Sequence, residues 1–205
     1  MVRQIATFAP EAMMLIDQAE TPQHDMKLLM KNKFPNVRCN VVLMSISNQA
    51  RMERLFSEFR PDYVFHAAAY KHVPMMEENP SESIQNNIYG TKVVADLSVK
   101  YGVKKFVMIS TDKAVNPTNV MGCSKRICEI YTQALNAKLV KEYEANGSKG
   151  EVPTQFVTTR FGNVLGSTGS VIPLFEKQIK AGGPVTVTDP KIIRFFMLIP
   201  EACKL

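Results

Sequence analysis

Short apolar runs alternate with helix-length stretches along most of this 205-residue chain. Strand-like apolar runs occur at 13–17, 37–44, 63–66, 105–110 and 155–160. Helical spacing or helix-compatible composition occupies about 21–33, 48–59, 81–101 and 122–143. Strands joined through helices return to a sheet as parallel neighbours, and the helices cover both of its faces. The sequence therefore predicts an α/β fold with a doubly wound, Rossmann-like parallel sheet.

The alternation stops near Gly166. We therefore predict a Rossmann-like domain at 1–166 and the beginning of a smaller substrate lobe at 167–205. Residues 144–153 are polar and contain glycine, which is typical of a surface loop rather than a domain boundary. With 45% hydrophobic and 21% charged residues, the composition is that of a globular protein.

Charge and cysteine content narrow the possible partners. The formal net charge is +6, but the basic residues are spread along the chain, which favours a phosphorylated small molecule over nucleic acid. No run of about 18 apolar residues occurs and the first residues lack a signal-peptide pattern, so we expect a cytoplasmic chain. The four cysteines and three histidines show no metal-ligand spacing, so we expect reduced thiols and no metal.

Ligands of such sheets bind beyond the carboxyl ends of the strands. Asp17 ends the first predicted strand, where an acid can bind the ribose hydroxyls of NAD and would repel the 2′-phosphate of NADP. This position alone fits a helix cap or a solvated loop acid equally well.

Small and basic residues follow the strand at 63–66, namely Ala67, Ala68, Ala69, Lys71 and His72. Small side chains would let the backbone approach a bound pyrophosphate or ribose, and the two basic side chains would supply donors. The alanines are also consistent with close packing of a helix on a strand. His66 is expected to be a structural polar residue.

A third polar cluster follows the strand at 105–110, and comprises Ser110, Thr111, Asp112 and Lys113. Met121 and Lys125 come next, one helical turn apart. A hydroxyl, a carboxylate and an amine together supply the proton donor and acceptor that chemistry on a sugar needs. The alternative is a capping turn followed by a solvated lysine.

Three long motifs resemble the polysaccharide-biosynthesis nucleotide-sugar 4,6-dehydratases, a family of extended short-chain dehydrogenases. They are Phe65–Pro74, Ser110–Lys125 and Thr159–Gly166, and the resemblance continues through Arg194–Met197 and Ile199–Ala202. The UDP-N-acetylglucosamine type is the most similar. The resemblance implies a bound NAD that takes hydride from sugar carbon 4 and returns it to carbon 6 after water has left.

The resemblance also implies roles for individual residues. Thr111 would assist proton transfer at the 4-hydroxyl, Asp112 would protonate the departing 6-hydroxyl, and Lys113 would be the base at carbon 5. A base needs a lowered pKa, which desolvation and the nearby Lys125 could provide. Lys125 would hold the nicotinamide ribose, and Met121 stands where most short-chain dehydrogenases have a catalytic tyrosine.

The implied UDP-sugar site includes His72 and several residues near the end of the chain. Asn163 matches an asparagine that contacts the diphosphate, Ser170 and Val171 match the uracil side, and Arg194 matches a phosphate-binding arginine. Asn163 could instead close a turn, and Arg194 could be a surface charge. We also expect a homo-oligomer. Membrane contact would come only through segments outside this chain, since full-length relatives can be anchored at the inner face of the bacterial membrane.

Two departures from the family pattern bear on activity. The family's first strand and glycine-rich turn are expected before Arg3 and are absent, which would leave a gap in the middle of the sheet and remove a pyrophosphate site. Met44 and Ser45 replace the Gly-Asp whose aspartate contacts adenine. An inactive fragment, a UDP-sugar 4-epimerase and a non-catalytic sugar-nucleotide-binding or assembly module therefore remain alternatives, although an epimerase would be expected to carry tyrosine at position 121.

Overall fold

A computed structural model describes residues 1–166, 171–187 and 189–204. The chain divides into two compact units, Met1–Thr159 and Arg160–Leu205. The assignment of 1–166 to a cofactor domain and 167–205 to a substrate lobe stays a prediction.

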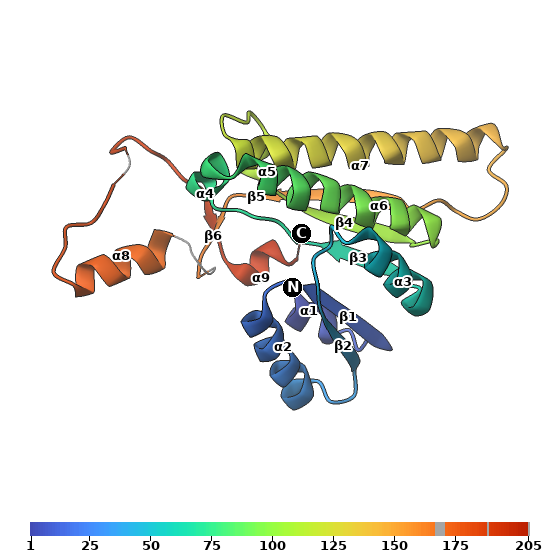
Figure 1. The fold of residues 1–205 in the computed structure, drawn as a ribbon, viewed down its shortest axis with the longest axis horizontal. Helices are drawn as coiled ribbons and strands as arrows, with labels where there is room; N and C mark the ends of the chain where they lie inside the picture. Colours follow the sequence, from blue (N-terminus) through green and yellow to red (C-terminus); the bar gives the residue numbers. More distant parts are fainter. Residues whose placement is uncertain (167–170, 188, 205) are drawn as a thin grey trace. The chain divides into compact units, whose positions relative to one another are not determined.

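A two-stranded parallel sheet begins the first unit. Strand β1 (Ala12–Asp17) pairs with β2 (Arg38–Leu43) in parallel, and the connecting helix α2 (Glu20–Lys33) packs beside them, as Figure 1 shows in blue. The short helix α1 (Val2–Ala6) precedes them. Apolar side chains from all these parts form a small core around Ala6, Met13, Met30 and Val37.

A second sheet has the order β3-β4-β5, with β3 (Tyr63–His66) parallel to β4 (Lys105–Thr111), and β5 (Gln155–Phe161) on the other side. Alternate residues of β4 are buried, because successive side chains of a strand point to opposite faces. Phe106 and Met108 are completely buried in this way, and Ser110 is carried onto the same buried face. The position of Ser110 at the end of β4 is therefore fixed by the packing of the strand.

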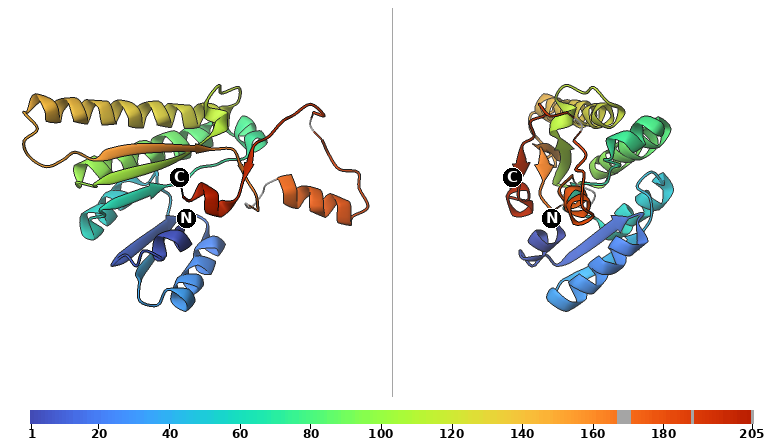
Figure 2. Two further views of the ribbon diagram at one scale, coloured as in Figure 1. Left: turned by 180° about the vertical axis from the view of Figure 1, so that it is seen from behind. Right: turned by 90° about the vertical axis from the view of Figure 1, so that its left-hand side faces the viewer.

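Helices flank these strands. They are α3 (Gln49–Phe59), α4 (Val73–Glu78), α5 (Pro80–Ser83), the π-helical segment η1 (Ile84–Tyr89), α6 (Gly90–Lys100), the 3-10 turn η2 (Asp112–Ala114) and α7 (Val120–Ala145). Helix α7 runs alongside α6, as both views in Figure 2 show. The helix predicted over 81–101 is interrupted by η1, and the other predicted helices lie close to their expected positions.

The structure confirms the predicted α/β fold with parallel strands. In the expected strand order, the family's first strand would lie between β1 and β3. Among the described residues, no strand pairs with the outer edge of β3 or with the edge of β1 that faces away from β2. The gap predicted for the middle of the sheet is therefore present in the part of the chain that the structure describes.

The second unit contains a short parallel pair, β6 (Asn163–Val164) with β7 (Phe196–Met197), together with α8 (Val171–Lys180) and α9 (Ile199–Ala202). None of the residues of α8 or α9 is buried among those described. Across residues 1–166, 171–187 and 189–204, no helix combines the length and apolar character needed to cross a membrane.

Candidate active site

A cavity of about 240 Å³ opens where β1, β2 and β3 end. The predicted residues Asp17, Ala67, Ala68 and Ala69 line it together, with further lining from Gln18, Ala19, Met44, Ser45, Ile46, Tyr70 and Asn86. Segments far apart in the sequence, at the carboxyl ends of strands from two sheets, thus line one cavity, and strand carboxyl ends are where ligands of such folds bind.

Two polar contacts shape this cavity. Asp17 Oδ1 accepts a hydrogen bond from the backbone N–H of Ala19 at 2.9 Å, which directs the carboxylate at the start of α2. Gln18 Nε2 donates to the Tyr70 hydroxyl at 2.8 Å. Lys71 and His72 are exposed and are not among the lining residues, so the structure does not bring these two predicted side chains into this cavity.

The end of β4 carries a compact hydrogen-bonded set. The Thr111 hydroxyl donates to Asp112 Oδ1 at 2.8 Å, and the Lys113 ammonium donates to the same oxygen at 3.0 Å. Partial burial alone would raise the pKa of Asp112, but the hydrogen bonds from Lys113 and Thr111 hold it below its usual value. The Asp112 side chain is therefore stabilised as a carboxylate that accepts hydrogen bonds from both neighbours.

Ser110 and Lys125 lie just inside this set. Among the described residues, the Ser110 hydroxyl is the buried side-chain polar group without a hydrogen-bond partner. The Lys125 ammonium donates to the carbonyl oxygen of Ile109 at 3.0 Å, so it lies beside the last residues of β4. Met121 is buried one turn earlier on the same helix. Its thioether cannot donate a proton.

The start of α7 is held tightly against η2. Asn119 caps the helix, because its Oδ1 accepts from the Gly122 N–H at 2.8 Å. A Cβ at Gly122 would lie 2.4 Å from the carbonyl oxygen of Lys113. Only glycine permits this approach, which places the Met121–Lys125 turn beside the loop that carries Lys113.

A buried network of hydrogen bonds joins Asn87, Thr91 and His66 next to the site. The Thr91 hydroxyl donates to the backbone oxygen of Asn87 at 2.5 Å, and it lies 2.7 Å from His66 Nε2, which therefore acts as the donor to Thr91. Burial, with a contribution from the Lys125 charge, lowers the pKa of His66 to about 3. His66 is consequently neutral at physiological pH, in agreement with the structural role expected for it.

Asn87 is a site-supporting residue that the sequence analysis missed. Its side chain accepts from the Tyr70 N–H at 2.8 Å and donates to the Tyr70 carbonyl and the Ser124 hydroxyl, each at 3.0 Å. It thereby joins the loop after β3 to the helix that carries Lys125. It lies in η1, and π-helical turns are frequent at functional sites.

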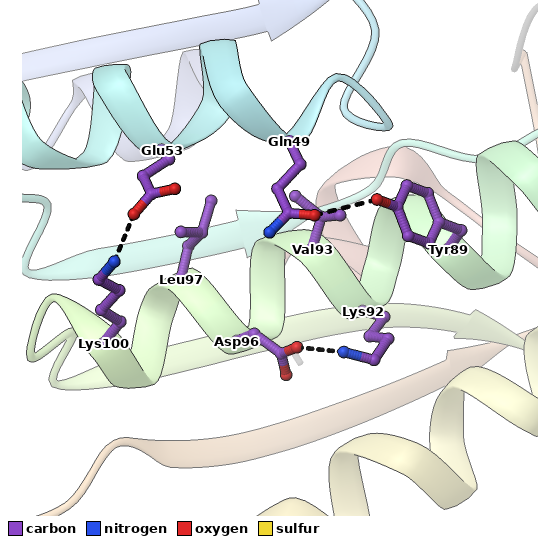
Figure 3. A pocket seen from close by; sticks show the side chains of 8 residues that line it. All are labelled: Gln49, Glu53, Tyr89, Lys92, Val93, Asp96, Leu97 and Lys100. Atoms are coloured by element: carbon purple, nitrogen blue, oxygen red, sulfur yellow. Dashed lines mark hydrogen bonds and ion pairs between the residues drawn. The ribbon is translucent and has the colours of Figure 1, made fainter.

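A second cavity, of about 140 Å³, lies between α3 and α6 (Figure 3). The charged side chains labelled in Figure 3 are paired with one another, Glu53 with Lys100 and Asp96 with Lys92. The Tyr89 hydroxyl donates to Gln49 Oε1 at 3.0 Å. Because these polar groups satisfy one another, this cavity offers a ligand little to bind.

Of the residues predicted to bind the UDP-sugar, His72 is exposed in the first unit, and the others belong to the second unit. Asn163 is half-buried in β6, where its backbone N–H donates to the carbonyl of Phe195 at 3.0 Å, and Val171 begins α8. Arg194 is exposed just before β7. Ser170 lies outside the described residues. Within the described ranges, no group of three or more potential metal ligands occurs.

Comparison with known proteins decides the family. The family model described as "Polysaccharide biosynthesis protein" matches residues 1–205. The chain belongs to this family. Capsular polysaccharide biosynthesis protein CapD from Staphylococcus aureus is 48% identical over 204 residues, which are 99% of this chain and 32% of that protein.

Further relatives of this polysaccharide-biosynthesis chain carry two enzyme names. A UDP-N-acetylglucosamine 4,6-dehydratase (inverting) from Campylobacter jejuni is 35% identical, over 98% of this chain and 55% of that protein. A UDP-glucose 4-epimerase from Rickettsia massiliae is 37% identical, over 93% of this chain and 51% of that protein. The chain thus spans about a third to a half of these relatives, and it is similar to proteins named as nucleotide-sugar dehydratases and epimerases.

Solved structures agree on the fold. Pen from Bacillus thuringiensis has a TM-score of 0.84 at 35% identity, covering 99% of this chain and 58% of that one. A double mutant of the dTDP-glucose 4,6-dehydratase DesIV from Streptomyces venezuelae, solved with NAD bound, has a TM-score of 0.78 at 19% identity, covering 99% of this chain and 65% of that one. The Rossmann-like fold of this chain is therefore that of known sugar-nucleotide enzymes.

Proposed function

We propose that this chain carries the catalytic core of an NAD-dependent UDP-N-acetylglucosamine 4,6-dehydratase of polysaccharide biosynthesis. The observation that carries the proposal is the hydrogen-bonded set of Thr111, Asp112 and Lys113 beside a buried Met121. This set supplies a carboxylate and an amine for proton transfer. The thioether of the neighbouring Met121 cannot transfer a proton.

The described residues fit the two ends of a dinucleotide. The cavity lined by Asp17 and Ala67–Ala69 suits the adenosine end, and the Asp17 carboxylate would repel a 2′-phosphate, which favours NAD over NADP. Near β4, a buried hydroxyl without a partner is unfavourable, so Ser110 is suited to bond a ligand beside Lys125. When bound, NAD would accept hydride from sugar carbon 4 and return it to carbon 6.

The ion pair provides both the acid and the base for loss of water. Movement of the shared proton from Lys113 Nζ to Asp112 Oδ1 would give a neutral amine and a carboxylic acid. The amine would then remove the proton from carbon 5, and the acid would protonate the 6-hydroxyl as it leaves as water. Thr111 would assist proton transfer at the 4-hydroxyl. Asn163, Ser170, Val171 and Arg194 remain our proposal for the UDP end.

A UDP-sugar 4-epimerase is the second candidate, because relatives with that name are 37% identical. An epimerase, like the dehydratase, removes hydride from carbon 4, but it returns the hydride to the same carbon. Met121 disfavours it, since the reaction would be expected to use a tyrosine at this position. A homo-oligomer, a cytoplasmic location and membrane attachment through segments outside this chain stay predictions.

The test is NAD binding by calorimetry on the purified chain, followed by addition of UDP-N-acetylglucosamine and analysis of the sugar product. We expect NAD to bind and a 4-keto-6-deoxy sugar nucleotide to form. Lys113→Ala should lower the rate of product formation by at least about 100-fold, as for loss of a general base, with unchanged NAD affinity. Lys138→Ala, at an exposed lysine of α7, is the matched control and should keep full activity.

Other outcomes point to the alternatives. A product inverted at carbon 4 that keeps its 6-hydroxyl would identify an epimerase. A folded sample that binds no NAD would contradict an autonomous enzyme and favour a non-catalytic module.

A further inference from the structure

Two serine hydroxyls lie in the turn between β2 and α3, and the proposed chemistry uses neither of them. The Oγ atoms of Ser45 and Ser47 are 2.8 Å apart, and either hydroxyl can be the donor of the hydrogen bond between them. Ser45 also lines the cavity of about 240 Å³ that contains Asp17. The hydroxyl pair is therefore part of the wall that faces a ligand in this cavity.

The turn that carries the pair is held at both ends. At its start, the Met44 N–H donates to the carbonyl oxygen of Asp17 at 2.9 Å. At its end, the Asn48 N–H donates to the carbonyl oxygen of Ser45 at 3.2 Å. The Asn48 side chain also caps α3, because its Oδ1 accepts from the Arg51 N–H at 3.1 Å. Ser45 is thus fixed at the cavity wall without a ligand, and such preorganisation lowers the entropic cost of binding.

Apolar side chains flank Ser45 in the wall of the cavity. Met44 and Ile46 are both buried, and both line the cavity. Ile46 is packed tightly against α6, since a Cβ at Gly90 would lie only 2.6 Å from Ile46 Cδ1. A mostly apolar wall with a precisely placed hydroxyl suits a flat heteroaromatic base, which has apolar faces and hydrogen-bonding groups along its edge.

The hydrogen bonds of the pair give Ser45 two alternative roles toward such a base. Ser45 Oγ already accepts from the Ser47 N–H at 3.2 Å. When Ser45 donates its hydrogen to Ser47, its second lone pair is free to accept from a ligand. When Ser47 donates to Ser45 instead, the Ser45 hydrogen is free to donate. Ser45 can therefore pair with an amino group or with a carbonyl oxygen, and neither choice leaves it without a partner.

We propose that Ser45, paired with Ser47, recognises the base in this cavity and accepts a 6-aminopurine and a 6-oxopurine with similar affinity. Adenine carries an amino donor at position 6 of the ring, whereas hypoxanthine carries a carbonyl acceptor there. The inference rests on the proposed function in that the cavity would hold the adenosine end of NAD, but it concerns only recognition of the base.

The experiment compares AMP with IMP, and then NAD with its hypoxanthine analogue, on the full chain. NMR of the ¹⁵N-labelled protein should show that AMP and IMP both shift the backbone amide signals of Ser45 and Ser47. The dissociation constants of the two mononucleotides should agree within about tenfold, because the hydroxyl pair satisfies either base. Calorimetry with the two dinucleotides should give a ratio in the same range.

Substitutions at Ser45 test the hydroxyl directly. A carboxylate only accepts hydrogen bonds, so Ser45→Asp should still bind the adenine amino group but disfavour the hypoxanthine oxygen. We expect Ser45→Asp to raise the preference for AMP over IMP by at least about tenfold. Ser45→Ala should weaken the binding of both mononucleotides by a similar factor. Ser57→Asp, which adds the same charge at an exposed serine of α3, should leave the preference unchanged.

The outcomes separate the inference from the proposed function. A preference for AMP above about tenfold in the unmodified protein would overturn the inference, as would a smaller rise than about tenfold in a folded Ser45→Asp protein. If Ser45→Asp does not fold, unequal weakening of AMP and IMP by Ser45→Ala would overturn it. NAD binding that leaves the Ser45 amide unshifted would contradict the inference alone. Binding of both mononucleotides at Ser45 without binding of NAD would support the inference and contradict the proposed function.

Discussion

His66 is a neutral base enclosed by the protein, and this makes folding sensitive to acid. Its pKa is about 3 in the folded chain, against 6.5 for the free side chain. Below about pH 6.5 the unfolded chain therefore binds a proton that the folded chain does not, and stability falls as pH falls until about pH 3. The expected loss is about 1.4 kcal/mol for each pH unit in this window.

We expect His66→Gln to flatten this dependence. Urea denaturation at pH 7, 6 and 5 should show a smaller fall in the free energy of unfolding than in the unmodified chain. His72→Gln removes an exposed histidine and should leave the slope unchanged. An unchanged slope in His66→Gln would mean that other groups dominate the acid sensitivity.

Single residues also show which parts of the candidate site can be predicted from the sequence. The polar set from Ser110 to Lys113 could be predicted because it directly follows an apolar run, and strand ends are where ligands bind. The role of Asn87 could not, since it depends on Tyr70 and Ser124, which lie 17 and 37 residues away. Hydrogen bonds between such distant segments leave no local pattern in a sequence.

Among the helices and strands, the contact between α7 and η2 depends on Gly122, which has no side chain. Gly122→Ala would place a Cβ 2.4 Å from the Lys113 carbonyl oxygen, so the helix start or the loop that carries Lys113 must move. We expect the free energy of unfolding to fall by about 1–3 kcal/mol, as for overpacking. Urea denaturation measures it, and Cys123→Ala, at the exposed neighbouring position, should have little effect. A Gly122→Ala protein with native stability would show that the contact relaxes easily.

The elements themselves were largely predictable from periodicity. The strands at 13–17 and 105–110 and the helix at 48–59 lie close to their observed bounds. The helix expected over 81–101 instead contains the π-helical segment at Ile84–Tyr89, within which Asn87 makes its contacts with Tyr70. Helical spacing of apolar residues does not distinguish a π-turn from an α-turn, so tertiary hydrogen bonds decided this difference.

For the whole molecule, the two open sheet edges predict a pattern of amide exchange. Strand β4 has neighbours on both sides, whereas β3 has one, so alternate amides of β3 point toward no strand among the described residues. We expect hydrogen exchange followed by NMR to show protection throughout β4 and alternating protection along Tyr63–His66. Uniform protection of β3 would mean that another segment covers its edge.

The unpaired edges of β1 and β3 also determine which further extended segments the protein could bind. The free side of β1 and the free side of β3 each carry unpaired N–H and C=O groups, and such a row templates any extended segment of suitable pattern. Tyr63 and Phe65 add exposed aromatic surface along β3. Where no strand fills this position, concentrated protein is expected to form intermolecular sheets and come out of solution. Whether the protein stays in solution therefore depends on whether a strand fills the gap between β1 and β3 before a strand of another molecule pairs with these edges.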